Sequence, residues 1–145
     1  MKVIINENSN LEEEEIIINC KKIEGKFLKL IEFLKIQEEK ICGNKDGKVY
    51  PLNSKDILFF ESVDKKTFIY TDNEVYETTL RLYELEEKFA EGDFFRSSKS
   101  TIINITKIKS INPLIGGKVE VVLDSDEKLL VSRQYVKTLK RKLDY

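Results

Sequence analysis

Short apolar segments joined by very short polar gaps fill the chain from about residue 40 to residue 131, and this spacing most constrains the fold. The segments Ile57 to Val63, Thr67 to Thr71 and Glu74 to Thr78 are separated by only three and two polar residues. Gaps of that length join neighbouring strands in hairpins. Consecutive strands of this kind favour an α+β fold, mostly β, built on an antiparallel meander, over a parallel doubly wound sheet.

The same pattern continues on both sides of this central meander. An Asp46-Gly47 turn predicts a hairpin of two further strands, Lys40 to Gly43 and Val49 to Leu52. Later strands are predicted at Phe94 to Ser97, Ile108 to Asn112, Lys118 to Leu123 and Lys128 to Val131. Helical spacing predicts two short helices, one with Leu82, Leu85 and Phe89, and a last one that Ser132 caps and that carries Val136, Leu139 and Leu143.

The first 44 residues have a different pattern. We expect strands at Lys2 to Ile5 and Glu15 to Cys20, then a helix from Glu24 to Gln37 whose apolar face carries Phe27, Leu30, Ile31 and Leu34. This β-β-α unit is too small to stand alone, so we expect two parts, residues 1–44 and residues 45–145. Its surplus of apolar surface predicts a homodimer, and the alternative is that it packs on the sheet of its own chain.

The residue content argues against an enzyme. The chain has 145 residues and no His, which excludes imidazole-based triads and His-ligated zinc. Neither a GxGxxG nor a GxxxxGK[ST] motif is present, so we expect no cofactor and no small-molecule substrate. Cys20 and Cys42 are too far apart for a CxxC motif, and no signal peptide or membrane-spanning run is evident. These features predict a cytoplasmic protein.

Charge is segregated along the chain although the total is close to neutral, with 25 Lys and Arg against 26 Asp and Glu. Residues 53–95 contain 5 basic and 11 acidic residues, whereas residues 96–142 contain 11 basic and 4 acidic residues. A basic face built from the last third of the chain suggests a polyanionic partner such as nucleic acid. Two alternatives stay open, namely that the two segments neutralise each other, or that the basic face binds an acidic protein.

Five blocks of the sequence form a recognisable series. They are Asp56 to Ser62, Thr79 to Leu82, Phe94 to Ile105, Ile108 to Ile111, and Leu130 to Arg133 before a short helix. In this order they resemble the LytTR family of bacterial DNA-binding domains. The resemblance covers about residues 49–143. It implies a mostly β domain that reads double-stranded DNA through loops between strands, placed along successive major grooves, rather than through a recognition helix.

The resemblance also implies which residues contact DNA. Carried over by position, base-edge or phosphate contacts would come from Lys65, Lys99 and Arg133, and the neighbouring phosphate contacts from Lys66, Arg96, Ser98, Ser100 and Lys137. An Arg guanidinium can read the O6 and N7 atoms of guanine in a bidentate manner, whereas a Lys cannot. The family often has His at the position of Ser98, and Arg or Asn at that of Lys99. Asn104 keeps the family's residue, and we expect it to bind backbone at a turn.

The length of the N-terminal segment bears on regulation. Many members of the family carry a phosphorylatable receiver domain before the DNA-binding domain, but only about 45 residues precede the resemblance here. We therefore expect a short stand-alone transcription regulator without phosphorelay control. Some regulators of this kind are restrained by a small membrane protein, which the resemblance adds as a potential partner.

Overall fold

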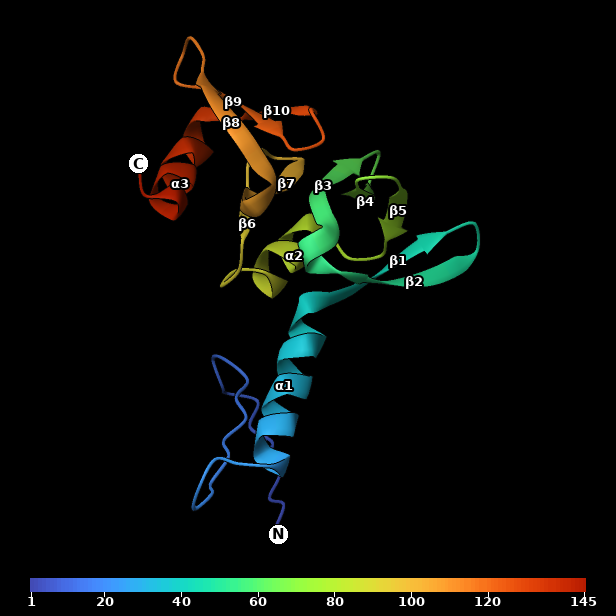
Figure 1. Cartoon of the computed structure of the whole chain (residues 1–145), viewed down its shortest axis with the longest axis vertical. Coiled ribbons are helices and arrows are strands. Elements are labelled where there is room, and N and C mark those ends of the chain that lie inside the picture. Colours follow the sequence, from blue (N-terminus) through green and yellow to red (C-terminus); the bar gives the residue numbers. More distant parts are fainter.

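The computed structural model describes all 145 residues and contains three α-helices and ten strands (Figure 1). The helices are α1 (Lys26–Glu39), α2 (Leu82–Lys88) and α3 (Arg133–Leu143). The strands are β1 (Lys40–Lys45), β2 (Lys48–Asn53), β3 (Ile57–Val63), β4 (Lys66–Thr71), β5 (Val75–Thr78), β6 (Phe94–Arg96), β7 (Thr101–Asn104), β8 (Ile108–Pro113), β9 (Val119–Leu123) and β10 (Lys128–Val131). The predicted α+β fold, mostly β, is confirmed.

The strands form two antiparallel sheets. The larger has seven strands in the order β2-β1-β5-β4-β3-β7-β6, and the smaller has three in the order β10-β9-β8. The predicted meander β3-β4-β5 lies at the centre of the larger sheet, paired through short turns. The β1-β2 hairpin extends one side of this meander, and β7 and β6 extend the other.

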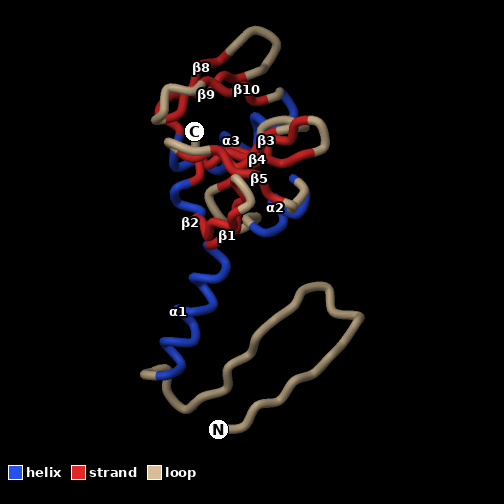
Figure 2. Tube along the Cα trace, turned by 90° about the vertical axis from the view of Figure 1, so that its right-hand side faces the viewer, coloured by secondary structure: helices blue, strands red, loops and turns tan.

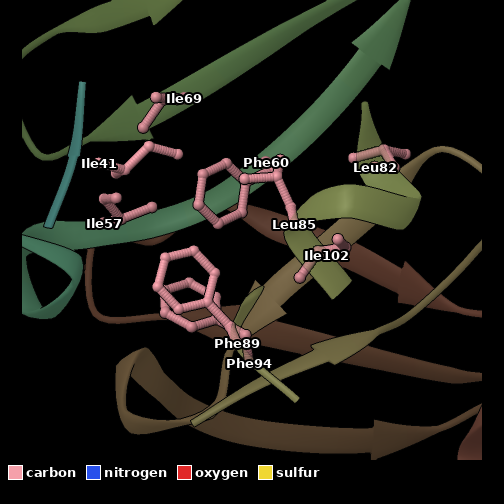
Figure 3. Close-up of a cluster of buried hydrophobic side chains, with 9 residues drawn as sticks. All are labelled: Ile41, Ile57, Phe60, Ile69, Leu82, Leu85, Phe89, Phe94 and Ile102. Atoms are coloured by element: carbon pink, nitrogen blue, oxygen red, sulfur yellow. The ribbon is translucent and has the colours of Figure 1, made fainter. Parts of the chain in front are cut away.

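Strand β3 is the centre of the core because both of its faces are covered. Its first four residues, Ile57 to Phe60, are all buried. Ile57 and Phe60 face a cluster under α2 that also contains Leu85 and Phe89 (Figure 3). Leu58 and Phe59 face a second cluster, formed with side chains of β9, β10 and α3. A register shift between Ile57 and Phe59 allows two consecutive residues to face the same side.

Helix α1 projects away from the sheets and buries none of its residues (Figures 1 and 2). The prediction of a helix here is confirmed, but the two N-terminal strands are wrong: Lys2 to Ile5 and Glu15 to Cys20 form neither strand nor helix. A strand is stabilised by hydrogen bonds to neighbours and by burial of one face, and the segments before α1 have neither in this chain. Helix α1 runs directly into β1, so the expected division after residue 44 falls inside this strand of the larger sheet.

Candidate nucleic-acid interface

Four connecting segments meet at one edge of the two sheets, which we call the loop edge. It comprises the β3-β4 turn (residues 64–65), the β6-β7 loop (residues 97–100), the β8-β9 loop (residues 114–118) and the start of α3 (residues 132–133). Backbone hydrogen bonds join three of them: Ser62, near the β3-β4 turn, donates to the Ser100 carbonyl at 2.8 Å, and Ser132 donates to the Ser97 carbonyl at 2.8 Å. The fourth segment, the β8-β9 loop, contacts the start of α3 through Gly117, which lies against the side chain of Arg133.

The predicted contact residues Lys65, Lys99 and Arg133 all lie on the loop edge, and all three are exposed. Lys65 occupies the tight β3-β4 turn, where Asp64 and Lys65 have φ angles of 49° and 68°. Two consecutive positive φ values are the signature of the hairpin turn whose twist matches that of its strands. The turn therefore holds Lys65 and the exposed Lys66 at the end of the sheet.

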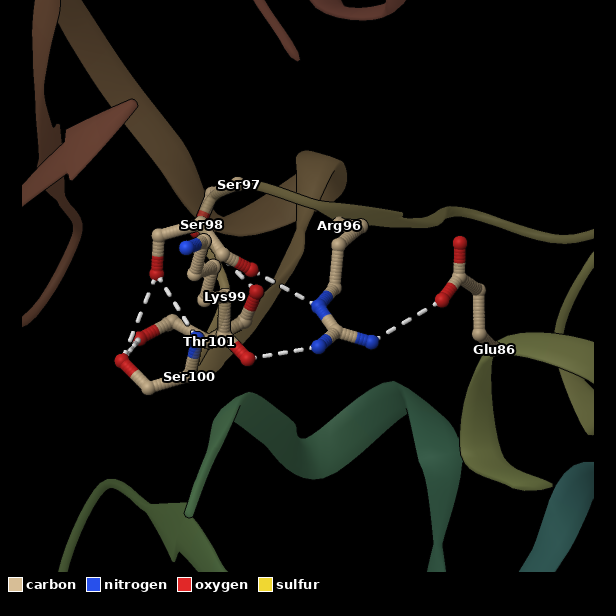
Figure 4. A network of polar contacts seen from close by, with 7 residues as sticks. All are labelled: Glu86, Arg96, Ser97, Ser98, Lys99, Ser100 and Thr101. Atoms are coloured by element: carbon tan, nitrogen blue, oxygen red, sulfur yellow. Dashed lines mark hydrogen bonds and ion pairs between the residues drawn. The ribbon is translucent and has the colours of Figure 1, made fainter. Parts of the chain in front are cut away.

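The guanidinium of Arg96 lies between the β6-β7 loop and Glu86 and holds the loop backbone (Figure 4). Its Nε donates to the Ser98 carbonyl at 2.7 Å, and its Nη2 donates to the Lys99 carbonyl at 2.5 Å. Its Nη1 donates to the Glu86 carboxylate of α2 at 3.0 Å. The side chain is only 19% exposed. Sequence reasoning expected Arg96 to contact phosphate, and it missed that this guanidinium supports the loop carrying Lys99.

The two loop serines also shape the loop. Ser98 Oγ accepts a hydrogen bond from the Ser100 amide at 3.2 Å and lies 3.4 Å from Ser100 Oγ. Ser97 is fully buried, and its hydroxyl donates to the Thr101 carbonyl at 3.2 Å. The serines close a compact turn from which the Lys99 side chain extends into solvent.

Asn104 lies in the interior, at the end of β7 opposite the β6-β7 loop, where it ties β7 to the start of β3. It is 2% exposed, and its Nδ2 donates to the Ile57 carbonyl at 2.8 Å. Its Oδ1 accepts from the amide and the hydroxyl of Thr106 at 3.0 Å and 2.7 Å. This confirms the expectation that Asn104 binds backbone at a turn and does not face outward.

Helix α3 presents a basic outer face. Arg133, Lys137 and Arg141 follow one another at intervals of four residues and are exposed, whereas Leu139 is fully buried in the core. Residues four apart lie on the same side of a helix, so these cations form one stripe that begins at the loop edge. Lys137 is one of the predicted phosphate contacts, and Arg141 continues the same stripe. Ser132 takes the N-cap position, although its side chain makes no capping hydrogen bond.

The basic surplus of the C-terminal segment is largely unpaired. The structure contains four ion pairs, of which only Arg96–Glu86 joins the basic segment to the acidic segment before it. Lys109 pairs with Asp126 at 2.8 Å inside the basic segment, and this hydrogen bond raises the pKa of Lys109 and lowers the pKa of Asp126. The idea that the two segments neutralise each other is therefore not supported.

Other kinds of site are not apparent in the structure. No group of three or more Cys, Asp or Glu residues is arranged to hold a metal ion. No helix has both the length and the apolar character needed to cross a membrane.

Comparison with known proteins gives a consistent result. The LytTr DNA-binding domain family matches residues 47–144. The chain is 33% identical over 107 residues to the sensory transduction protein LytT of Enterococcus faecalis, covering 74% of this chain but only 44% of LytT. It is 28% identical over 145 residues to a Staphylococcus aureus protein named as an uncharacterized HTH-type transcriptional regulator, covering 99% of this chain and 98% of that protein.

The fold has a solved counterpart. The LytTr DNA-binding domain of a Bacillus cereus protein superposes with a TM-score of 0.70 at 22% identity, over 74% of this chain and 98% of that one. Despite the name of the Staphylococcus relative, this chain contains no helix-turn-helix, because strands separate each of its α-helices from the next. The family match over residues 47–144, two thirds of the chain, shows that the chain belongs to the LytTr DNA-binding domain family, and the solved structure shares its fold.

Proposed function

We propose that the protein is a cytoplasmic, sequence-specific transcription regulator that reads double-stranded DNA through the loop edge. The observation that carries the proposal is the arrangement of Lys65, Lys99 and Arg133. They come from three connecting segments that are distant in sequence, and the fold brings these segments into one row joined by backbone hydrogen bonds. A row of rigidly connected loops suits the successive major grooves along one side of a duplex.

The residues have different roles in this proposal. Arg133 reads a guanine edge: its side chain is exposed and engaged in no ion pair, so the guanidinium is free to make the bidentate contact. Lys65 and Lys99 supply point charges to phosphates or to a guanine. Phosphate contacts come from Lys66, Ser98, Ser100 and Lys137. Arg96 acts indirectly, since three of its donors are used inside the chain.

The second candidate function is a module that binds an acidic protein through the same basic face. The exposed stripe on α3 would suit either partner. The two functions differ in what they discriminate, because a DNA reader distinguishes base sequences and a charge-binding module does not.

Selection of bound sequences from a random duplex library tests the proposal. We expect a defined motif, and direct repeats spaced near one helical turn if two domains bind together. Binding to the selected duplex should weaken with salt with a log-log slope of about −3 to −6, since each neutralised phosphate contributes about −0.9. Failure to retain any duplex at low salt would refute the proposal, and retention without sequence preference would favour the second candidate.

We also propose that the N-terminal part pairs two copies of the chain through α1. Leu28, Leu30, Phe33 and Ile36 are between 43% and 57% exposed, and no residue of α1 is buried. A helix of this length is marginal without tertiary contacts, so a second copy is the partner we propose. The small membrane-protein inhibitor suggested by the family resemblance is the other occupant, and it would compete for the same surface.

Sedimentation of the full-length protein tests the pairing. The double variant Phe33→Glu, Ile36→Glu should shift a dimer to a monomer. Tyr83→Glu is the control, because Tyr83 is also a large exposed side chain, 63% exposed, but lies on α2. A wild-type protein that sediments as a monomer at tens of micromolar would eliminate the pairing through α1.

A further inference from the structure

We propose that Gly117 is a positioning residue for Arg133, because the absence of a side chain at position 117 leaves room for the Arg133 side chain against the β8-β9 loop. The inference rests on the proposed DNA-reading function and adds a specificity-determining residue to it. Nothing in the pattern of basic residues indicates Gly117, because it carries no side chain and lies on a different segment from Arg133.

The β8-β9 loop is a tight connection with two consecutive glycines at its end. The amide of Leu114 donates to the Lys118 carbonyl at 2.9 Å and closes the loop. Gly116 and Gly117 have φ angles of 87° and 78°, a region that favours glycine at both positions. Backbone conformation alone therefore accounts for both glycines and does not distinguish them.

The neighbours of the two glycines do distinguish them. A Cβ atom built on Gly117 would lie 3.0 Å from Cδ and 3.1 Å from Cγ of Arg133, closer than ordinary van der Waals contact. A Cβ atom built on Gly116 would meet nothing within 4 Å. The aliphatic stem of Arg133 thus lies against Gly117, so close that a Cβ atom at position 117 would force the stem to shift by a few tenths of an ångström.

This contact matters because nothing else in the chain orients the guanidinium. Arg133 is the first residue of α3 and is exposed, and its side chain makes neither a hydrogen bond nor an ion pair within the chain. A bidentate contact with guanine requires the plane of the guanidinium to align with the base edge. A side chain at position 117 would displace the Arg133 stem by a few tenths of an ångström or more and turn the guanidinium away from that plane. The flexible Arg133 would yield before the domain did, so the effect should appear in specificity rather than in folding.

The test compares Gly117→Ala with the matched control Gly116→Ala. Both variants place an alanine at a similar positive φ, and only the first meets Arg133. The probe is the selected duplex and a copy altered at the base pair whose discrimination is lost in Arg133→Ala. We expect Gly117→Ala to reduce discrimination at this base pair by about 3- to 10-fold, part of the value of a bidentate contact, and Gly116→Ala to leave it unchanged.

A double-mutant comparison separates positioning from a general effect on the loop. In an Arg133→Ala background, Gly117→Ala should cause no further loss of discrimination. If alanine at position 117 prevents folding, as judged by thermal melting, the pair Gly117→Asn and Gly116→Asn replaces it, since Asn tolerates positive φ and still carries a Cβ. Equal effects at positions 116 and 117, or a loss that persists without Arg133, would overturn the inference. A wild-type protein that binds no duplex would instead refute the proposed function itself.

Discussion

Removing the Arg96 side chain is the perturbation that the structure defines best. Arg96→Ala deletes two hydrogen bonds to the carbonyls of Ser98 and Lys99 and the ion pair with Glu86. A hydrogen bond from a charged donor contributes about 1.5 to 3 kcal/mol to stability. Ser98 is half-buried and Lys99 is exposed, so water can partly replace both hydrogen bonds in the variant. We therefore assign the two bonds together a contribution of about 1.5 kcal/mol. The half-exposed ion pair adds about 0.5 kcal/mol or less.

We therefore expect Arg96→Ala to lower the free energy of unfolding by about 2 kcal/mol, measured by urea denaturation. The matched variant Glu86→Gln removes only the ion pair and should cost about 0.5 kcal/mol or less. If the two variants are equally stable, the carbonyl contacts contribute nothing and the reasoning fails.

The same variant separates loop support from direct phosphate contact. Through its effect on the loop, Arg96→Ala should weaken DNA binding, but in a Lys99→Ala background it should leave the salt dependence unchanged. A residue that neutralised a phosphate directly would lower the slope by about 0.9 in either background. A decrease of that size in the Lys99→Ala protein would show that Arg96 touches DNA and would refute its role as a support.

Three further predictions concern the interface and the packing of the domain behind it. Arg133→Ala should reduce specific affinity by about 1 to 3 kcal/mol and spare non-specific binding, whereas Lys137→Ala should weaken both alike, in proteins shown by melting to be folded. Asn104→Ala leaves a buried backbone carbonyl of β3 without its donor and should cost about 2 to 4 kcal/mol in urea unfolding; a loss below 0.5 kcal/mol, on the order of a surface substitution, would contradict this. Burial raises the pKa of Tyr70 above 10.0, with Glu61 adding to the effect, so folding favours the neutral phenol. This preference for the neutral phenol stabilises the folded state fully below pH 10, and the stabilisation is lost as the pH rises through the raised pKa of Tyr70. The Tyr70→Phe variant has no phenol to ionise, so between pH 9 and pH 11 its free energy of unfolding should fall less than that of the wild type.

Local signals in the sequence were sufficient to predict most of the strands from residue 57 onward. The predicted bounds of β3 and β10 coincide with those in the structure, and those of β4, β5 and β9 differ by one residue at one end. In this region apolar alternation and turn residues act between close neighbours in the chain, so one sequence contains the necessary information. The helix α1 was predicted for the same reason, from the spacing of its apolar residues.

The N-terminal strands failed because their formation depends on partners. The run Ile16 to Ile18 has high strand propensity, but in the structure no neighbouring strand hydrogen-bonds to it. Propensity describes how well a residue fits a sheet and does not supply the sheet. The local pattern likewise could not predict the order of the strands, in which the β1-β2 hairpin pairs with β5, because this order depends on contacts between distant segments.

For the interface, the sequence by itself determined the basic character of the C-terminal segment and, through resemblance to a family, the positions of Lys65, Lys99 and Arg133. Only the tertiary structure showed that Arg96 is used inside the chain and that Gly117 lies against Arg133. The formal charge of a residue is fixed by its type, whereas the partner that takes its hydrogen bonds is set by which distant segments pack beside it. A basic residue that supports a loop and one that faces DNA are therefore alike in the sequence and differ only in the folded protein.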